Sequence, residues 1–217
     1  GYFHERQMGM AFRRLSIIDP EGGDQPLYSE DGRIVITCNG EIYNFKDLRT
    51  DLEARGHVFS TQSDAEVVLH GYEEYGADIV KHLRGMFAFV LYDRAAGKFF
   101  GARDPFGIKP LYFYQRGDTF LYASEIKAFL PHPNFRRAFH EKWLSTYLCF
   151  EYVPCSETLF EDVYKLPPGY AFTYENGVLS MARYFTPAYE IRRGRPLDAW
   201  AEELETVFAG SCRAHRI

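Results

Sequence analysis

Three separated parts of the sequence carry side chains that together suit the binding of a free amino acid. Arg14 stands in the segment FRRLSIID, the pair Asn39-Gly40 follows an apolar run, and Asp64 precedes a helical pattern. A guanidinium pairs well with an α-carboxylate, and a carboxylate pairs well with an α-ammonium. An amide side chain beside an unobstructed glycine N–H can stabilise a carbonyl oxygen on which negative charge develops. These groups predict an amino-acid site if the fold brings them together.

Each group also has a plain structural interpretation. An Asn-Gly pair after a strand is more often a turn than an oxyanion hole. Asp64 can serve only as the cap of its helix, and Arg14 can pair with any acidic residue on the surface. Taken singly, the three signals are therefore weak.

Cys38 lies directly before the Asn-Gly pair, in VITCNGEIYNF, and is the first candidate for a nucleophile. An internal cysteine has no free α-amino group to act as its base, and this one lies inside a predicted strand, so we interpret it as a packing residue. The other thiols are Cys149, Cys155 and Cys212, and we expect the first two to be buried as small hydrophobic residues. No Cys-x-x-Cys pair is present, and the seven histidines are scattered without ligand spacing, so no metal site is predicted.

The composition limits the classes of function. The chain has 217 residues, of which 46% are hydrophobic and 25% are charged, so it can bury one substantial core. Its net charge of -5 is mild and both signs are mixed along the chain, which argues against a nucleic-acid partner and against a basic membrane face. The sequence shows no signal peptide and no long apolar span, and we expect a cytoplasmic protein with reduced thiols.

Strands dominate the middle of the chain. The β-branched run at 33–39 predicts a strand, and two hairpins are predicted at 86–104 and 111–125. We place their turns near 95–98 and 116–118. The first strand of the 86–104 hairpin is apolar at odd and even positions, so both of its faces must be covered.

Helical patterns lie between these strands. Asn44 can cap a helix that Gly56 ends, and Ser63 or Asp64 can open a helix that ends at Gly76. Antiparallel hairpins with two apolar faces and helices between them indicate stacked sheets covered by helices. The predicted fold class is therefore α+β.

The last part of the chain changes in character. A helix is predicted near 140–148, and a hairpin is predicted at 163–185 with its turn at Glu-Asn-Gly. The polar segment 189–196 reads as a linker, and apolar residues recur with helical spacing over 197–217. Since the chain starts without a Met and stops within a helical pattern, we expect it to be a fragment of a longer protein.

Seven motifs favour the amino-acid site over the plain structural interpretations of the same residues. They occur in one order along nearly the whole chain: RRLSIID (13–19), NGEIYNF (39–45), SDAEVVLHGYEEYG (63–76), RGMFAFVLYD (84–93), ARDPFGIKPLYF (102–113), YASEIKAFL (122–130) and KLPPGY (165–170). In this order they resemble the glutamine-hydrolysing asparagine synthetases, which are class II glutamine amidotransferases. Seven ordered motifs are far more specific than a single short pattern.

The resemblance implies a glutaminase domain of the N-terminal nucleophile type. That fold is a four-layer αββα sandwich of two mostly antiparallel sheets between helices. By the same resemblance, residues 1–188 are the glutamine amidotransferase domain, 189–196 are the linker, and 197–217 begin the ATP-binding synthetase domain. No cofactor is expected in this chain, and ATP and Mg²⁺ are expected in the remainder of the synthetase domain.

The resemblance also assigns roles to individual residues. Arg14 is expected to hold the α-carboxylate of glutamine, and Asp64 its α-ammonium. Asn39 and the Gly40 N–H are expected to form the oxyanion hole, and Glu41 to shape the pocket. Glutamine, aspartate and ATP are the expected small-molecule partners, and a homodimer is a candidate assembly.

Two segments of the family pattern lie outside this sequence. One is the amino-terminal cysteine that acts as nucleophile, and the other is the Ser-Gly-Gly-x-Asp-Ser loop of the synthetase domain. We therefore expect the chain as given neither to hydrolyse glutamine nor to make asparagine. Two alternatives stay open: the glutaminase-like domain of a related β-lactam or macrolactam synthetase, and a glutamine-binding scaffold without turnover.

Overall fold

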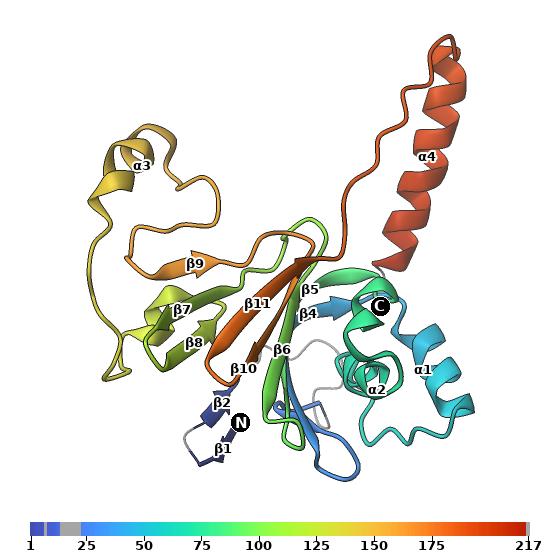
Figure 1. Ribbon diagram of the computed structural model, residues 1–217. Coiled ribbons are helices and arrows are strands. Elements are labelled where there is room, and N and C mark those ends of the chain that lie inside the picture. The colour runs from blue at the N-terminus through green and yellow to red at the C-terminus, as the bar shows by residue number, and fades with distance from the viewer. Residues whose placement is uncertain (7, 14–22, 216–217) are drawn as a thin grey trace.

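The computed structural model describes residues 1–6, 8–13 and 23–215, and it shows an α+β fold built on two antiparallel sheets (Figure 1). The predicted fold class is confirmed. Arg14 lies outside the described residues. Among the described residues, none of the helices combines the length and the apolar character that crossing a bilayer requires.

The large sheet has six strands in the order β11-β10-β6-β5-β4-β3. Its strands are β3 (Leu27–Tyr28), β4 (Ile34–Ile42), β5 (Gly85–Asp93), β6 (Lys98–Arg103), β10 (Tyr170–Glu175) and β11 (Val178–Arg183). The centre of this sheet is the antiparallel pair β4–β5, whose register runs from Ile34 opposite Asp93 to Ile42 opposite Gly85. The β5–β6 and β10–β11 hairpins turn where the sequence predicts.

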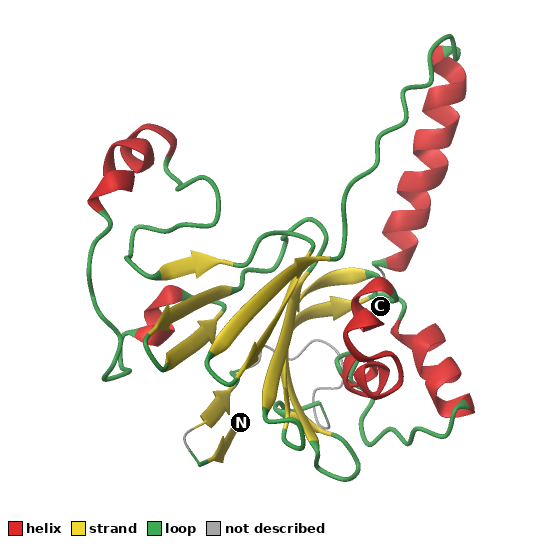
Figure 2. Cartoon of the chain, in the orientation of Figure 1, coloured by secondary structure: helices red, strands yellow, loops and turns green. Residues whose placement is uncertain are grey.

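Both faces of the large sheet are covered, as the apolar run in β5 requires. On one face, Phe87, Phe89 and Phe100 pack with the helices α1 (Phe45–Ala54) and α2 (Glu66–Tyr75). On the other face, Ala88 and Val90 pack toward the small sheet. Alternating residues of one strand therefore contribute to two different cores. The helices and the small sheet lie on opposite sides of the large sheet (Figure 2).

The two helices begin and end near the predicted residues, but the predicted side-chain caps at their N-termini do not form. Asn44 makes no cap hydrogen bond, because its amide bridges the His82 carbonyl and the Arg84 N–H at 2.9 Å each. It thereby ties the start of α1 to the chain before β5. Ala65, not Ser63 or Asp64, directly precedes α2, and Gly76 ends that helix with φ of 58°.

The small sheet has three strands in the order β8-β7-β9. Its strands are β7 (Tyr112–Arg116), β8 (Thr119–Ala123) and β9 (Val163–Lys165). Tyr114 and Val163 of this sheet pack with Phe129 and Phe135, which lie in and after the 3₁₀ helix Ile126–Phe129. The outermost layer on this side is thus a short 3₁₀ helix and irregular chain.

The remaining elements lie at the periphery. They are the hairpin strands β1 (Tyr2–Glu5) and β2 (Met8–Ala11), the 3₁₀ helices Gly76–Lys81 and Glu141–Trp143, and the helices α3 (Leu144–Phe150) and α4 (Leu197–Ala214). Neither α3 nor α4 has a buried residue. Most of α4 stands away from both sheets, but its C-terminal end comes back to the end of β4, where the rings of His215 and Tyr43 lie 4.1 Å apart (Figure 1). Cys149 and Cys155 are exposed, so the expectation that they are buried is wrong.

Candidate active site

The candidate site lies at the end of β4, where the strand extends past its short neighbour β3. The β3 ladder covers only Val35 and Ile36. Beyond it, the Gln25 side chain takes the place of a strand, because its amide donates to the Cys38 carbonyl at 3.0 Å and accepts from the Cys38 N–H at 2.6 Å. This pair of bonds fixes the β4 backbone directly before Asn39.

Asn39 points toward the small sheet. Its Nδ2 donates a hydrogen bond to Ser124 Oγ at 3.1 Å, and Ser124 directly follows β8. Thr37, on the same face of β4, has its hydroxyl 3.5 Å from that of Tyr122. The Asn39 amide is therefore held between the two sheets, half-buried, with its direction set by Ser124.

Ser124 is a site residue that the sequence alone misses. Ser before a helical pattern is typical of a cap, but the 3₁₀ helix at Ile126–Phe129 has no side-chain cap bond and Ser124 contacts Asn39 instead. The contact joins residues 85 positions apart, so no local pattern indicates it.

Gly40 occupies a position that a side chain cannot share. Its φ is +144°, and a Cβ there would lie 2.0 Å from the Met86 carbonyl oxygen and 2.7 Å from the Phe87 Cα. The Phe87 carbonyl accepts from the Asp104 N–H, on the side of β5 away from β4. The facing Gly40 N–H therefore points away from β5, toward the edge where Gln25 binds Cys38.

Asp64 meets β4 from the helix side. Its side chain is 6% exposed, and its Oδ2 accepts the Ile42 N–H at 2.7 Å. Burial raises the pKa of this carboxyl above its ordinary value, backbone N–H groups act against the rise, and the charge of Glu41 adds to it. A cation placed at Asp64 would relieve this unfavourable burial of charge.

Glu41 and Tyr43 complete the described part of the site. Glu41 is half-buried, and after burial its charge is the main cause that raises the pKa of Tyr43. The Tyr43 hydroxyl is buried and has no hydrogen-bond partner among the described residues. The structure thus gathers Asn39, Gly40, Glu41 and Asp64 around one strand end.

The loop after β6 has a structural role. The buried Asp104 carboxylate accepts the N–H groups of Phe106, Ile108 and Lys109 at 3.0 Å each. Arg103 donates to the carbonyls of Lys109, Leu166 and Gly107. Both charged side chains hydrogen-bond to the backbone and hold this turn in place. The turn is therefore not an anion-binding loop.

Cys38 is a core residue. It is 3% exposed and belongs to the cluster between β4, β5 and the helices. Burial raises the pKa of its thiol well above the ordinary value, with a smaller contribution from the Asp64 charge. Since the thiolate is the reactive form, this cysteine is unreactive at neutral pH, as the sequence predicts.

Comparison with solved structures shows the class of fold. The structure resembles the glutamine phosphoribosylpyrophosphate amidotransferase of Bacillus subtilis with a TM-score of 0.54 at 22% identity, covering 75% of this chain and 32% of that one. A second solved structure, described as the allosteric regulatory enzyme of purine biosynthesis, matches with a TM-score of 0.53 at 21% identity. The fold is that of the N-terminal nucleophile type of glutamine amidotransferase.

Sequence comparison then gives the family. Residues 1–185 match the model of the glutamine amidotransferase domain, and the chain belongs to that family. It is 45% identical over 186 residues to asparagine synthetase [glutamine-hydrolyzing] 1 of Bacillus subtilis, which covers 85% of this chain and 29% of the relative. It is also 52% identical over 120 residues to asparagine synthetase [glutamine-hydrolyzing] 3 of Arabidopsis thaliana, covering 55% of this chain and 20% of the relative. The chain thus spans less than a third of the length of these relatives.

Proposed function

We propose that this chain forms the glutamine site of an asparagine synthetase. The observation that carries the proposal is the arrangement at the end of β4. There, Asn39 reaches between the two sheets to Ser124, the Gly40 N–H points to the free edge of the strand, and Asp64 accepts the Ile42 N–H. The match of residues 1–185 to the glutamine amidotransferase domain supports it. Within that family, we choose an asparagine synthetase because relatives of that name are 44–45% identical to this chain.

In the proposed complex, the Asp64 carboxylate binds the α-ammonium of glutamine and Arg14 binds its α-carboxylate. The side-chain carbonyl of glutamine then lies toward Asn39 and the Gly40 N–H. Attack by a cysteine thiolate on that carbonyl forms a C–S bond and places negative charge on the oxygen, which these two groups stabilise. The α-amino group of that cysteine, which takes up the thiol proton, passes it to the amide nitrogen. Collapse then breaks the C–N bond, releases ammonia and leaves a thioester, which water hydrolyses to glutamate and the free thiol.

The nucleophile in this proposal is the amino-terminal cysteine of the family rather than Cys38. We further propose that the ammonia reacts with an aspartate that ATP and Mg²⁺ have activated as a β-aspartyl adenylate, in a second domain. The products would be asparagine, AMP and pyrophosphate. The β-lactam and macrolactam synthetases would use another acceptor with the same glutamine site.

The sharpest test of the glutamine site is Asn39→Ala in the full-length protein. Loss of an oxyanion-hole donor should lower kcat for glutamine hydrolysis by about 10²- to 10³-fold. The loss should fall on kcat more than on KM, because the bond strengthens in the transition state. Release of glutamate from glutamine is the measurement.

Asn134→Ala is a matched control. Asn134 Nδ2 also donates to a hydroxyl, that of Thr119 at 3.1 Å, but it lies outside the site. Its replacement should change glutamine hydrolysis by less than about twofold, since surface changes seldom matter. Glutaminase activity that survives Asn39→Ala within a few-fold would remove the oxyanion assignment, and glutamine binding without any turnover in the parent protein would support the scaffold alternative.

A further inference from the structure

A second group of polar side chains lies where the segment after α1 meets α2. His57 follows α1, while His70 and Glu73 stand three positions apart on α2. One ligand atom from each of the three lies within 4.8 Å of the others. The two histidines are thirteen positions apart in the sequence, so no metal-binding motif is visible there, although the fold brings their rings to 5.2 Å between centroids.

The distances in this group suit a shared ion. Glu73 Oε2 lies 2.9 Å from His70 Nδ1 and 3.5 Å from His57 Nδ1. Ligand atoms around a tetrahedral zinc ion, at bonds of about 2.0–2.1 Å, lie roughly 3.3 Å apart. Glu73 Oε2 is therefore already near this spacing from both Nδ1 atoms, and side-chain rotations within the 4.8 Å limit can make the three residues ligands of one ion.

The far nitrogen of each ring also faces a carboxylate. His70 Nε2 lies 3.6 Å from Glu66 Oε1, and His57 Nε2 lies 3.6 Å from Glu74 Oε2. Histidines that bind a metal through one nitrogen usually direct the other N–H to a carboxylate or carbonyl, which fixes the tautomer and the ring direction. His70 is 1% exposed, and its Nε2 has no hydrogen-bond partner among the described residues.

Glu66 is held rigidly behind His70. Its carboxylate accepts from the N–H and hydroxyl of both Ser60 and Thr61, at distances from 2.5 to 2.8 Å. The outer partner of His70 is thus fixed by the loop that connects α1 to α2. A rigid outer partner favours one orientation of the ring it faces.

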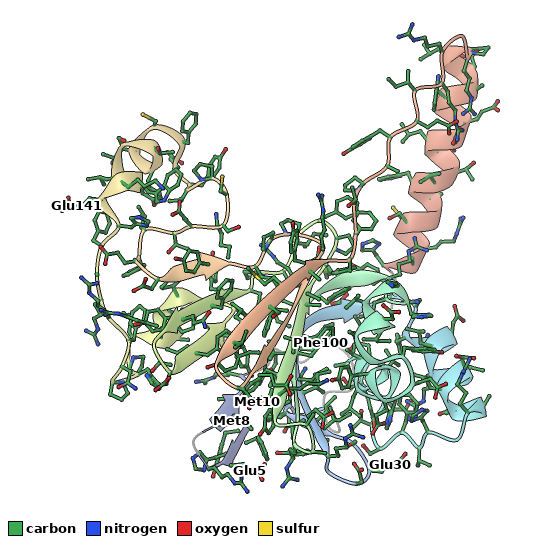
Figure 3. All side chains as sticks on the ribbon, viewed as in Figure 1. Glu5, Met8, Met10, Glu30, Phe100 and Glu141 are labelled. Carbon is green, nitrogen blue, oxygen red and sulfur yellow. The ribbon has the colours of Figure 1, made fainter. Side chains whose placement is uncertain are left out.

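The group opens to solvent through a depression lined by Glu30, Asp31, His57 and Glu73. Glu30 lies on the turn between β3 and β4, at the lower edge of the helix side (Figure 3). Glu30 and Asp31 add negative charge at the entrance, which attracts cations. Water can supply a fourth ligand.

We propose that His57, His70 and Glu73 bind a divalent transition-metal ion of the zinc class. Two imidazoles and one carboxylate are a donor set that suits such ions better than Mg²⁺ or Ca²⁺, which prefer oxygen alone. The ion joins the segment after α1 to α2, the helix that starts next to Asp64. Its role is therefore structural, since it steadies the helix side of the glutamine site.

The test is a titration of the metal-free 217-residue chain with Zn²⁺ by calorimetry and with Co²⁺ by visible absorption. We expect one ion per chain and the intense d–d bands of tetrahedral Co²⁺. His57→Ala and Glu73→Gln each remove a ligand from a partly exposed side chain, so the fold should survive, as circular dichroism will check. Each should weaken Zn²⁺ binding by more than about 100-fold, and Glu74→Gln, which changes only an outer partner, by about 10-fold.

His132→Ala is the matched control, because His132 lies after the 3₁₀ helix Ile126–Phe129, outside the group. It should bind Zn²⁺ like the parent chain. Failure of the parent chain to bind Zn²⁺ at micromolar concentration would overturn the proposal, and the group would be an ion-pair cluster only. Equal binding by the parent and both ligand variants would overturn it as well. No step uses glutamine, so the outcome is separate from that of the glutamine-site test.

Discussion

Two parts of the molecule carry helices with similar amphipathic patterns but opposite surroundings. On the helix side of the large sheet, α1 buries Phe45, Leu48 and Leu52, and most of α2 is buried. At the other end of the chain, α4 is the longer helix, with 18 residues, and buries none of them. Its apolar residues, including Leu204 and Phe208, are mostly exposed. An amphipathic pattern therefore predicts a helix, but a facing surface decides whether it is buried.

The strongest way to test the packed side is to disturb the strand that it shares with the site. Gly40→Ala places a Cβ against the Met86 and Phe87 backbone, which cannot move without parting β4 from β5. Strain and overpacking together should lower the free energy of unfolding by about 4 kcal/mol. Urea denaturation followed by tryptophan fluorescence measures it.

Gly56→Ala supplies the control for that effect. Gly56 also has a positive φ, +100°, but nothing lies within 4 Å of the Cβ that a substitution would add. Only the backbone strain remains, so the loss should be about 1–2 kcal/mol. Equal losses in the free energy of unfolding for the two variants would show that the close approach of β4 and β5 is not the reason why position 40 needs glycine.

A pair of leucine truncations compares the two kinds of helix directly. Leu52 in α1 is fully buried, and Leu52→Ala should cost about 3 kcal/mol through lost burial and the cavity left behind. Leu204 in α4 is 69% exposed, and Leu204→Ala should change stability by less than about 0.5 kcal/mol. A large loss at Leu204, measured on the 217-residue chain, would contradict the unpartnered state of α4.

Cys38→Ala separates packing from chemistry at the site. The thiol is buried in the helix-side core, so its removal should cost stability by about 1 kcal/mol. Glutamine hydrolysis by the full-length variant should stay within about twofold of the parent, because a buried protonated thiol is not a nucleophile. Abolished turnover in a folded variant would reopen Cys38 as the nucleophile.

The smallest expected effect concerns pH at the rim of the large sheet. Burial alone would raise the pKa of Asp93, but hydrogen bonds from Arg33 and from the Ala95 and Ala96 N–H groups hold it below its ordinary value. A lowered pKa stabilises the fold above the unfolded value of about 3.9, and this contribution is lost as the pH falls through the folded pKa. Arg33 is half exposed, so its share is about 1 kcal/mol or less.

Arg33→Gln isolates that share. Between about pH 5 and pH 3, the parent chain should lose more stability than the variant, because the variant's Asp93 pKa lies closer to the unfolded value. Urea midpoints at several pH values give the comparison. Parallel pH curves would show that Arg33 does not set the pKa of Asp93.

Much of the fold follows from local patterns. The hairpin turns near 95–98, 116–118 and 175–177 are where Gly and polar residues interrupt apolar runs, and the structure places them there. The two-sided burial of β5 follows from its unbroken apolar run. Caps were harder to predict, since Asn44 and Ser124 contact residues that are distant in the sequence.

By itself, the sequence determined the central hairpins, the two helices between them, the family motifs and the candidate residues Arg14, Asn39, Gly40, Glu41 and Asp64. Their types and order are local information that a single chain displays. Only the tertiary structure decided what these side chains contact: Ser124 behind Asn39, the Ile42 N–H on Asp64, and the meeting of His57 with His70. These contacts join chain segments far apart, and their geometry depends on how the sheets and helices pack rather than on any local pattern.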